Sequence, residues 1–488
     1  MKRSCAPSLR VLALALASVG SLTACAVGPV YQQPTVQSPA AWREAKAAEG
    51  WVPAAPADAM DRGDWWRLFG DADLDALAAR VQISNQNIAS AVASYAQAQA
   101  LVREQRAGLF PTVSASGSAT RSGNRSADTA TGGASAGVSA SWTPDVWGRL
   151  GQAVNSAEAD AQASEADLAA ARLSAIGDLS ANYFSLREAD AELALLSATL
   201  EGYERSLTIA RNRYEAGIAA QSDVLQAQTQ LINTRAERVA LERTRTAYEH
   251  AIAVLVGTAP ADFQLPTASR WSPTVPSVPL GVPSTLLQRR PDIAAAERSV
   301  ASANAQIGIA RAAYYPSFGL SASLSRSSSR VSDLFSASNT LWSIGLSAAQ
   351  VLFDAGAIAA RVDAARASYD GTVARYRQTV LTAFQTVEDQ LTATASLAQQ
   401  ETLRREASAA ADKTEQQILN RYRAGQVSYT EVVTAQASAL SARRTVLQLQ
   451  VSRQNAAVTL IQALGGGWEA GWLATVPQAT VPQATVPR

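Results

Sequence analysis

The chain contains two copies of one unit, and this duplication limits its fold more than any other feature of the sequence. Residues 211–228 and 419–436 align without a gap, 208 positions apart, and share eight identities in eighteen positions. Other pairs recur at nearly the same spacing: Phe110-Pro111 with Tyr315-Pro316, Ile88 with Ile293, and Gly148 with Gly356. Because a fixed period marks a repeated supersecondary unit, the sequence predicts one duplicated architecture rather than two unrelated domains.

Each unit is predicted to run helix, two strands, long helix, turn, helix. The first unit occupies 76–258, with strands at 111–121 and 134–143 and the turn at 213–217. The second occupies 284–464, with strands at 316–326 and 340–350 and the turn at 421–425. The opening helices are expected over Leu74–Gly108 and Ser284–Ala313. Segments 25–75, 259–283 and 465–488 flank the units, and the last ends in a proline repeat expected to be disordered.

The long helix of the first unit carries a heptad pattern. Leucines recur every seven residues at 179, 186, 193, 200 and 207, followed by Tyr214. A second series stands three residues further on, at Leu196, Tyr203 and Ala210. This 3–4 alternation predicts a coiled-coil seam. A helix over 149–213 would be about 100 Å long, which suits a molecule that crosses a space.

The four predicted strands alternate apolar residues with serine or glycine over about ten residues, which is the length and pattern of membrane-spanning strands. In one of them Phe318, Leu320, Ala322 and Leu324 alternate with Gly319, Ser321 and Ser323. Trp142 and Trp342 stand where an interfacial aromatic belt is expected. Four strands leave two open edges in lipid, so other copies must close the sheet, and three copies give twelve strands and a lumen. The alternative is a set of soluble, serine-rich hairpins.

The first 24 residues predict a lipoprotein signal peptide. Basic residues precede a short apolar run that is too short to span a bilayer, and the segment ends in Leu22-Thr23-Ala24-Cys25, a lipobox pattern. Cys25 is the only cysteine that remains after cleavage, so it has no disulfide partner. We expect Cys25 to carry a covalent lipid that anchors the mature chain to the outer membrane.

The composition argues against catalysis, metal binding and nucleic-acid binding. The chain has one histidine, His250, and two cysteines, which leaves few side chains for zinc sites or for Cys/His and Ser/His catalysis. Its net charge is +1, whereas a nucleic-acid-binding protein needs a basic patch. We therefore expect no enzyme, no metal site, no cofactor other than the lipid, and no nucleic-acid partner.

Several motifs resemble the TolC-like outer-membrane factors of tripartite efflux systems, in the lipoprotein OprM/NodT-type branch. They are Asp64-Trp65-Trp66-Arg67-Leu68, Leu287-Gln288-Arg289-Arg290-Pro291-Asp292-Ile293, Leu352-Phe353-Asp354-Ala355-Gly356 and the stretch from Ala463 to Trp468. The resemblance implies a mainly α protein with a membrane β-barrel. In a homotrimer, twelve strands would form one barrel in the outer membrane, and the long helices would form an α-barrel in the periplasm, surrounded by a belt from 30–75, 259–283 and the C-terminal region.

The resemblance also implies sites and partners. The two tip turns, with Arg213, Tyr214, Gly217, Arg421, Tyr422 and Gly425, would meet a periplasmic adaptor (membrane fusion) protein that bridges to an inner-membrane RND-type pump. The candidate periplasmic gate consists of Tyr429, Glu431 and Thr434. Relatives often carry an acid at the position of Thr434, so a carboxylate ring is in doubt here. Glu431 either supplies such a ring or is a solvated surface charge.

These observations predict a passive exit duct for small molecules such as drugs, opened when the adaptor binds its open state more tightly. Two alternatives stay open: the exit duct of a type I protein-secretion system, and a lipid-anchored coiled-coil spacer. The sequence does not select among drugs, solvents and metal ions as substrates.

Overall fold

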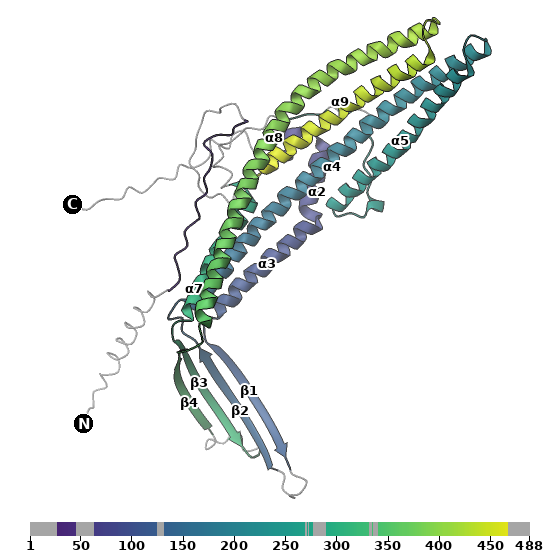
Figure 1. The fold of residues 1–488 in the computed structure, drawn as a ribbon. Helices are drawn as coiled ribbons and strands as arrows, with labels where there is room; N and C mark the ends of the chain where they lie inside the picture. The colour runs from purple at the N-terminus through teal and green to yellow at the C-terminus, as the bar shows by residue number, and fades with distance from the viewer. Residues whose placement is uncertain are drawn as a thin grey trace, which may run out of the picture. The chain divides into compact units, whose positions relative to one another are not determined.

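The computed structural model describes residues 27–44, 63–123, 131–268, 271, 273–276, 289–330, 334 and 340–466. The signal peptide, Cys25 and the proline repeat lie outside these residues. The described elements are η2 (Trp65–Phe69), α2 (Ala72–Ser84), α3 (Gln86–Ala107), β1 (Thr112–Ser122), β2 (Thr131–Trp142), α4 (Arg149–Glu215), α5 (Gln221–Leu255), η3 (Pro260–Asp262), α7 (Pro291–Ala312), β3 (Ser317–Ser328), β4 (Thr340–Ala349), α8 (Ala357–Arg423) and α9 (Tyr429–Ala463). This mainly helical fold with one antiparallel sheet confirms the predicted fold class (Figure 1).

The two halves repeat each other element by element. Helices α3 and α7 each contain 22 residues, α4 and α8 each contain 67, and α5 and α9 each contain 35. A pair of strands stands between α3 and α4 in the first half and between α7 and α8 in the second. The internal similarity of the sequence is therefore a duplication of the whole helix–hairpin–helix–helix unit.

The opening helix of the first half differs from the prediction, because Leu74–Gly108 is not one helix. Asn85 has an extended backbone (φ −67°, ψ 123°) and separates α2 from α3. Its side-chain oxygen accepts hydrogen bonds from the backbone N–H groups of Asn87 and Ile88, at 3.0 and 3.1 Å, so it caps α3. Its amide nitrogen donates to the Leu255 carbonyl at 2.8 Å, which ties the break to the end of α5.

The strands form one sheet in the order β1-β2-β3-β4, with every neighbouring pair antiparallel. The register places apolar residues in continuous rows across the sheet, for example Ala115, Val138, Leu324 and Trp342. Serines occupy the other face, and Ser114–Ser139 and Ser323–Ser343 form hydroxyl hydrogen bonds of 2.9 Å across neighbouring strands. The edges of the sheet are β1 and β4.

The chain divides into two compact units, which are described separately. The first consists of 1–36, 93–166 and 295–379, and so contains the sheet. The Tyr31 hydroxyl donates to the carboxylate of Glu297 there, and burial raises the pKa of Tyr31. The Trp147 ring stacks on Tyr315, with 4.8 Å between the ring centroids.

The second unit consists of 37–92, 167–294 and 380–488, and its core follows the predicted heptad. The side chains of Leu179, Leu186 and Leu196 are fully buried, and Tyr203 and Ala210 continue the buried series. Tyr214, the last residue of the pattern, is exposed and lies one residue before the end of α4. The coiled-coil pattern therefore reports the seam along which α4 packs in this unit.

An ion network centred on two buried side chains, Arg187 and Asp190, was not foreseen from the sequence. The Arg187 guanidinium pairs with Asp73 at 2.6 Å and Asp190 at 3.2 Å and donates to the Pro266 carbonyl at 2.9 Å. Asp190 also pairs with Arg245 at 2.6 Å. Burying charges is costly unless they are paired and hydrogen-bonded, so these contacts fix α2 and the segment after η3 against α4 and α5.

The Arg289-Arg290-Pro291-Asp292 motif has a structural role. Arg290 pairs with Asp292 at 2.7 Å and donates to the Ala463 carbonyl at 3.0 Å, the last residue of α9. Pro291 opens α7, a position at which proline needs no backbone N–H. The motif therefore joins the start of α7 to the end of α9.

Candidate functional site

The long helices α4 and α8 each end in a turn, and the two turns have the same backbone conformation. After α4, Gly217 has φ 73°, the Gly217 N–H bonds to the Tyr214 carbonyl at 2.9 Å, and the Ile218 N–H bonds to the Arg213 carbonyl at 2.8 Å. After α8, Gly425 has φ 75°, with the equivalent bonds to the carbonyls of Tyr422 and Arg421, both at 2.9 Å. These are left-handed helix caps, which glycine adopts at no steric cost.

The side chains of the two turns are placed differently. Tyr214 is 45% exposed, whereas its sequence equivalent Tyr422 is 2% exposed. Tyr422 packs edge-on against Tyr429, with 5.2 Å between the ring centroids. The Tyr422 ring is therefore part of the core beneath the turns, and it can reach a docked partner only if the turn rearranges. Arg421, Gly217 and Gly425 are exposed.

Arg213 joins the two turns. Its guanidinium carbon lies 4.9 Å from the centroid of the Tyr422 ring, and its Nη1 donates to the carbonyls of Tyr422 and Arg423, at 3.0 and 3.2 Å. The Tyr422 hydroxyl lies 3.5 Å from the carboxylate of Asp223, in the first turn of α5. Sequence reasoning missed Asp223, whose only signal was its alignment with Glu431.

The three candidate gate residues do not form one cluster. Tyr429 is buried in the core cluster of the turns, and burial raises its pKa above the ordinary tyrosine value. Glu431 and Thr434 are exposed on α9, where the Thr434 hydroxyl donates to the Thr430 carbonyl at 2.9 Å. The structure thus joins Tyr429 to the Arg213–Tyr422 contact, and it leaves the roles of Glu431 and Thr434 as predictions.

The sheet is a second functional element, because its apolar face is exposed. Trp342, Ile344 and Leu346 are 74%, 74% and 73% exposed, and Val113, Val138, Leu320 and Leu324 share their face. An exposed apolar patch of this extent, backed by a hydroxyl face, marks an interaction surface. Within the described residues, no helix is long and apolar enough to cross a membrane, and no group of three or more His, Cys, Asp or Glu side chains could hold a metal ion.

The chain is similar in sequence to known proteins. The chain matches the family model of the outer membrane efflux proteins over residues 77–258 and 282–466. It is 32% identical to the antibiotic efflux pump outer membrane protein ArpC of Pseudomonas putida, covering 92% of this chain and 93% of that protein. It is 31% identical to the cation efflux system protein CusC of Escherichia coli O6:H1, covering 92% and 97%.

Solved structures of outer-membrane channels have a similar fold. The outer-membrane channel OprN has a TM-score of 0.81 at 30% identity, covering 91% of this chain and all of that one. The open state of the Neisseria gonorrhoeae MtrE channel has a TM-score of 0.79 at 26% identity, covering 91% and 98%. The chain belongs to the outer membrane efflux protein family, and it is an outer-membrane channel that serves as the exit duct of an efflux pump. Members of this family are channels rather than enzymes.

Proposed function

We propose that three copies of the chain close their sheets into one twelve-stranded barrel in the outer membrane and that their helices enclose a water-filled duct. The observation that carries this proposal is the sheet, which has an apolar face open to its surroundings, a hydroxyl face opposite, and edges at β1 and β4. Only closure satisfies the backbone groups of both edges in lipid. Eight strands from two copies would be filled by side chains, whereas twelve leave a lumen.

A second surface supports assembly with further copies. Four exposed apolar residues recur every seven positions along α5 and the turn before it. They are Ile218 in the turn and Leu225, Ile232 and Val239 in the helix. A heptad of exposed apolar residues is a coiled-coil seam without its partner helix. The same helices in a neighbouring copy would cover it.

Conduction through this duct is passive, and the chain carries out no catalysis. The energy comes from an inner-membrane RND-type pump, reached through a periplasmic adaptor that docks on the tip turns and favours their open arrangement. Cys25 carries a covalent lipid, and conduction needs no cofactor. The relatives include antibiotic, cation and pyoverdine exporters, so the family does not select the substrate, and we propose small molecules such as drugs.

Photo-crosslinking tests the assembly in cells. A photo-reactive residue at Ala216, exposed in the first tip turn, should link the chain to the adaptor, identified by mass spectrometry. A photo-reactive residue in place of Val239, on the exposed seam, should link one copy of the chain to another and give a band of three copies on a denaturing gel. Links from Val239 to the adaptor, or none from Ala216 in cells that contain adaptor and pump, would contradict the proposal.

A further inference from the structure

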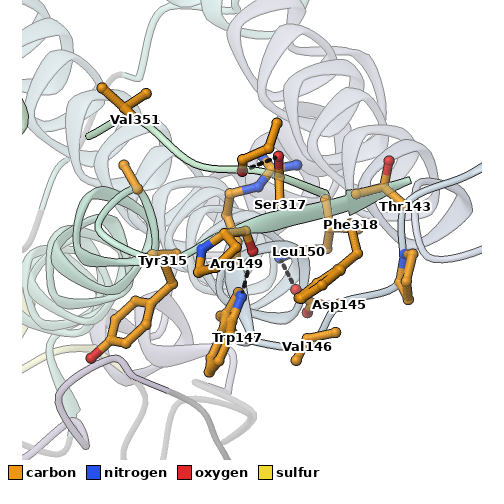
Figure 2. Close-up of a pocket in the computed structure, with 15 residues that line it drawn as sticks. Thr143, Asp145, Val146, Trp147, Arg149, Leu150, Tyr315, Ser317, Phe318 and Val351 are labelled. Atoms are coloured by element: carbon orange, nitrogen blue, oxygen red, sulfur yellow. Dashed lines mark hydrogen bonds between the residues drawn. The ribbon is translucent and has the colours of Figure 1, made fainter. Parts of the chain in front are cut away.

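A cavity of about 190 Å³ lies at one end of the sheet, where β2 leads into α4 and α7 leads into β3 (Figure 2). Trp147 and Tyr315 stack at one side of it, and the Trp147 indole N–H donates to the Pro316 carbonyl at 2.7 Å. Phe318, Leu150 and Val351 supply apolar walls. The aromatic pair is held in place by packing and by a hydrogen bond, so the cavity is a preformed feature of this unit.

The surroundings of the cavity are apolar and exposed. Leu352 and Phe353, which follow the cavity residue Val351, are 91% and 88% exposed. Phe110, before β1, and Tyr314, before β3, are also exposed. They lie at the same end of the sheet, because the register pairs the start of β1 with the end of β2 and the start of β3 with the end of β4. Single exposed apolar residues are ordinary, but a group of them at one end of a sheet with an exposed apolar face calls for an apolar neighbour.

The lining of the cavity also includes a positively charged side chain. Arg149, which lines it, is exposed, and within the described residues its guanidinium makes no ion pair or hydrogen bond. The acid of the cavity, Asp145, is engaged by backbone amides, accepting from Leu150 N–H at 2.9 Å and Gly151 N–H at 2.6 Å. Arg149 is therefore the charged group of the cavity that lacks a partner within the described residues.

We propose that this cavity binds a glycerophospholipid of the leaflet that faces the periplasm. The Arg149 guanidinium holds the phosphate, because its planar donors match phosphate oxygens. Trp147 and Tyr315 lie at the level of the ester groups, where amphipathic aromatic rings are favoured. The acyl chains cover Leu352 and Phe353. The inference rests on the proposed membrane location of the sheet, at one end of which these residues lie.

A lipid fits these features better than a free phosphate does. A phosphate ion would pair with Arg149 and leave Leu352 and Phe353 in water. The apolar residues and the cation are satisfied together only by a molecule with a phosphate at one end and hydrocarbon at the other.

Native mass spectrometry of the full-length protein, extracted in detergent and mixed with dioleoyl phosphatidylethanolamine, tests the site. The wild type should retain one lipid per chain. Arg149→Gln should lower retention about tenfold, because a charge-assisted contact to the phosphate is lost. Arg330→Gln is the matched control, because Arg330 is an exposed arginine just past the other end of β3, and it should retain lipid like the wild type.

Two further measurements separate a lipid site from an anion site. Phe353→Ser changes an exposed side chain and should also lower lipid retention, although it leaves Arg149 in place. The soluble head group glycerophosphoethanolamine, which lacks acyl chains, should not displace the lipid. Equal retention by Arg149→Gln and Arg330→Gln, or displacement of the lipid by this head group, would overturn the inference.

The mass of each complex and its conductance in planar bilayers distinguish the two proposals. If wild type and variants all form conducting trimers but bind lipid alike, the lipid site is refuted and the channel stands. If the wild type forms no trimer and no pore, the proposed function fails whatever the lipid measurement gives.

Discussion

Replacing Arg213 by alanine should loosen the contact between the two tip turns and favour an open helical end. In the structure its guanidinium covers the Tyr422 ring and donates through Nη1 to the carbonyls of Tyr422 and Arg423. Because one nitrogen serves both carbonyls, we count the pair as one charge-assisted hydrogen bond, worth about 1.5–2 kcal/mol. The cation–π contact adds about 0.5–1 kcal/mol.

Arg213 is partly exposed, so solvent screening lowers this sum to roughly 2 kcal/mol per chain. About 2 kcal/mol corresponds to roughly a thirtyfold change in the ratio of closed to open turn, since each 1.4 kcal/mol is tenfold. The expected result is a channel that opens more often without its adaptor. Single-channel recording in planar bilayers measures this as an increase in open probability.

Two variants control the measurement. Arg211→Ala removes an exposed arginine two residues earlier in α4 whose side chain forms no hydrogen bond or ion pair within the described residues, and it should behave like the wild type. Arg213→Lys keeps the charge but loses the planar guanidinium, so its open probability should be intermediate. Equal open probabilities for Arg213→Ala and Arg211→Ala would refute the idea that this contact holds the tip closed.

Three further predictions concern stability, each measured by chemical or thermal unfolding. Gly257→Ala should destabilise by about 1–3 kcal/mol, because Gly257 has φ 68° and a Cβ there would lie 2.2 Å from the backbone oxygen of Ser84; an unchanged midpoint would contradict this packing. Asn85→Ala should cost about 2 kcal/mol, through loss of the α3 cap and of a buried hydrogen bond. A loss below about 0.5 kcal/mol, the usual limit for a surface change, would show that the cap is dispensable. Burial, followed by the charge of Glu192, raises the pKa of Glu188 from the ordinary glutamate value of 4.5 to about 7, so the folded state binds more protons than the unfolded state between these values. Stability should therefore fall as pH rises from 4.5 to 7, and Glu188→Gln should remove that part of the slope; an identical slope in the variant would contradict the assignment.

The repeat, the heptad and the strand alternation could be predicted from the sequence, because each is a periodic pattern that reports one face of an element. Buried Leu179 and Leu186 and exposed Ile344 and Leu346 lie where their periods place them. The helix break at Asn85 was missed because the helical pattern continues on both sides. An asparagine cap becomes visible only when its side chain is seen bonding to the next turn.

The candidate site was only partly predictable, because its decisive contacts join residues far apart in the sequence. Tyr214 and Tyr422 occupy equivalent positions, yet tertiary packing against Tyr429 buries only the second. The partners Asp73 and Arg187 are 114 positions apart, and no local pattern connects them. Local sequence therefore located the turns, whereas the fold decided which of their side chains remain exposed.

Single-particle imaging of the complex extracted from outer membranes, together with its mass from light scattering, tests the central claim most directly. The account predicts three chains around one continuous lumen, with a sheet of twelve strands closed around its membrane end. A monomer, or an assembly without a lumen, would contradict the channel and return the serine-rich strands to soluble hairpins on a lipid-anchored spacer.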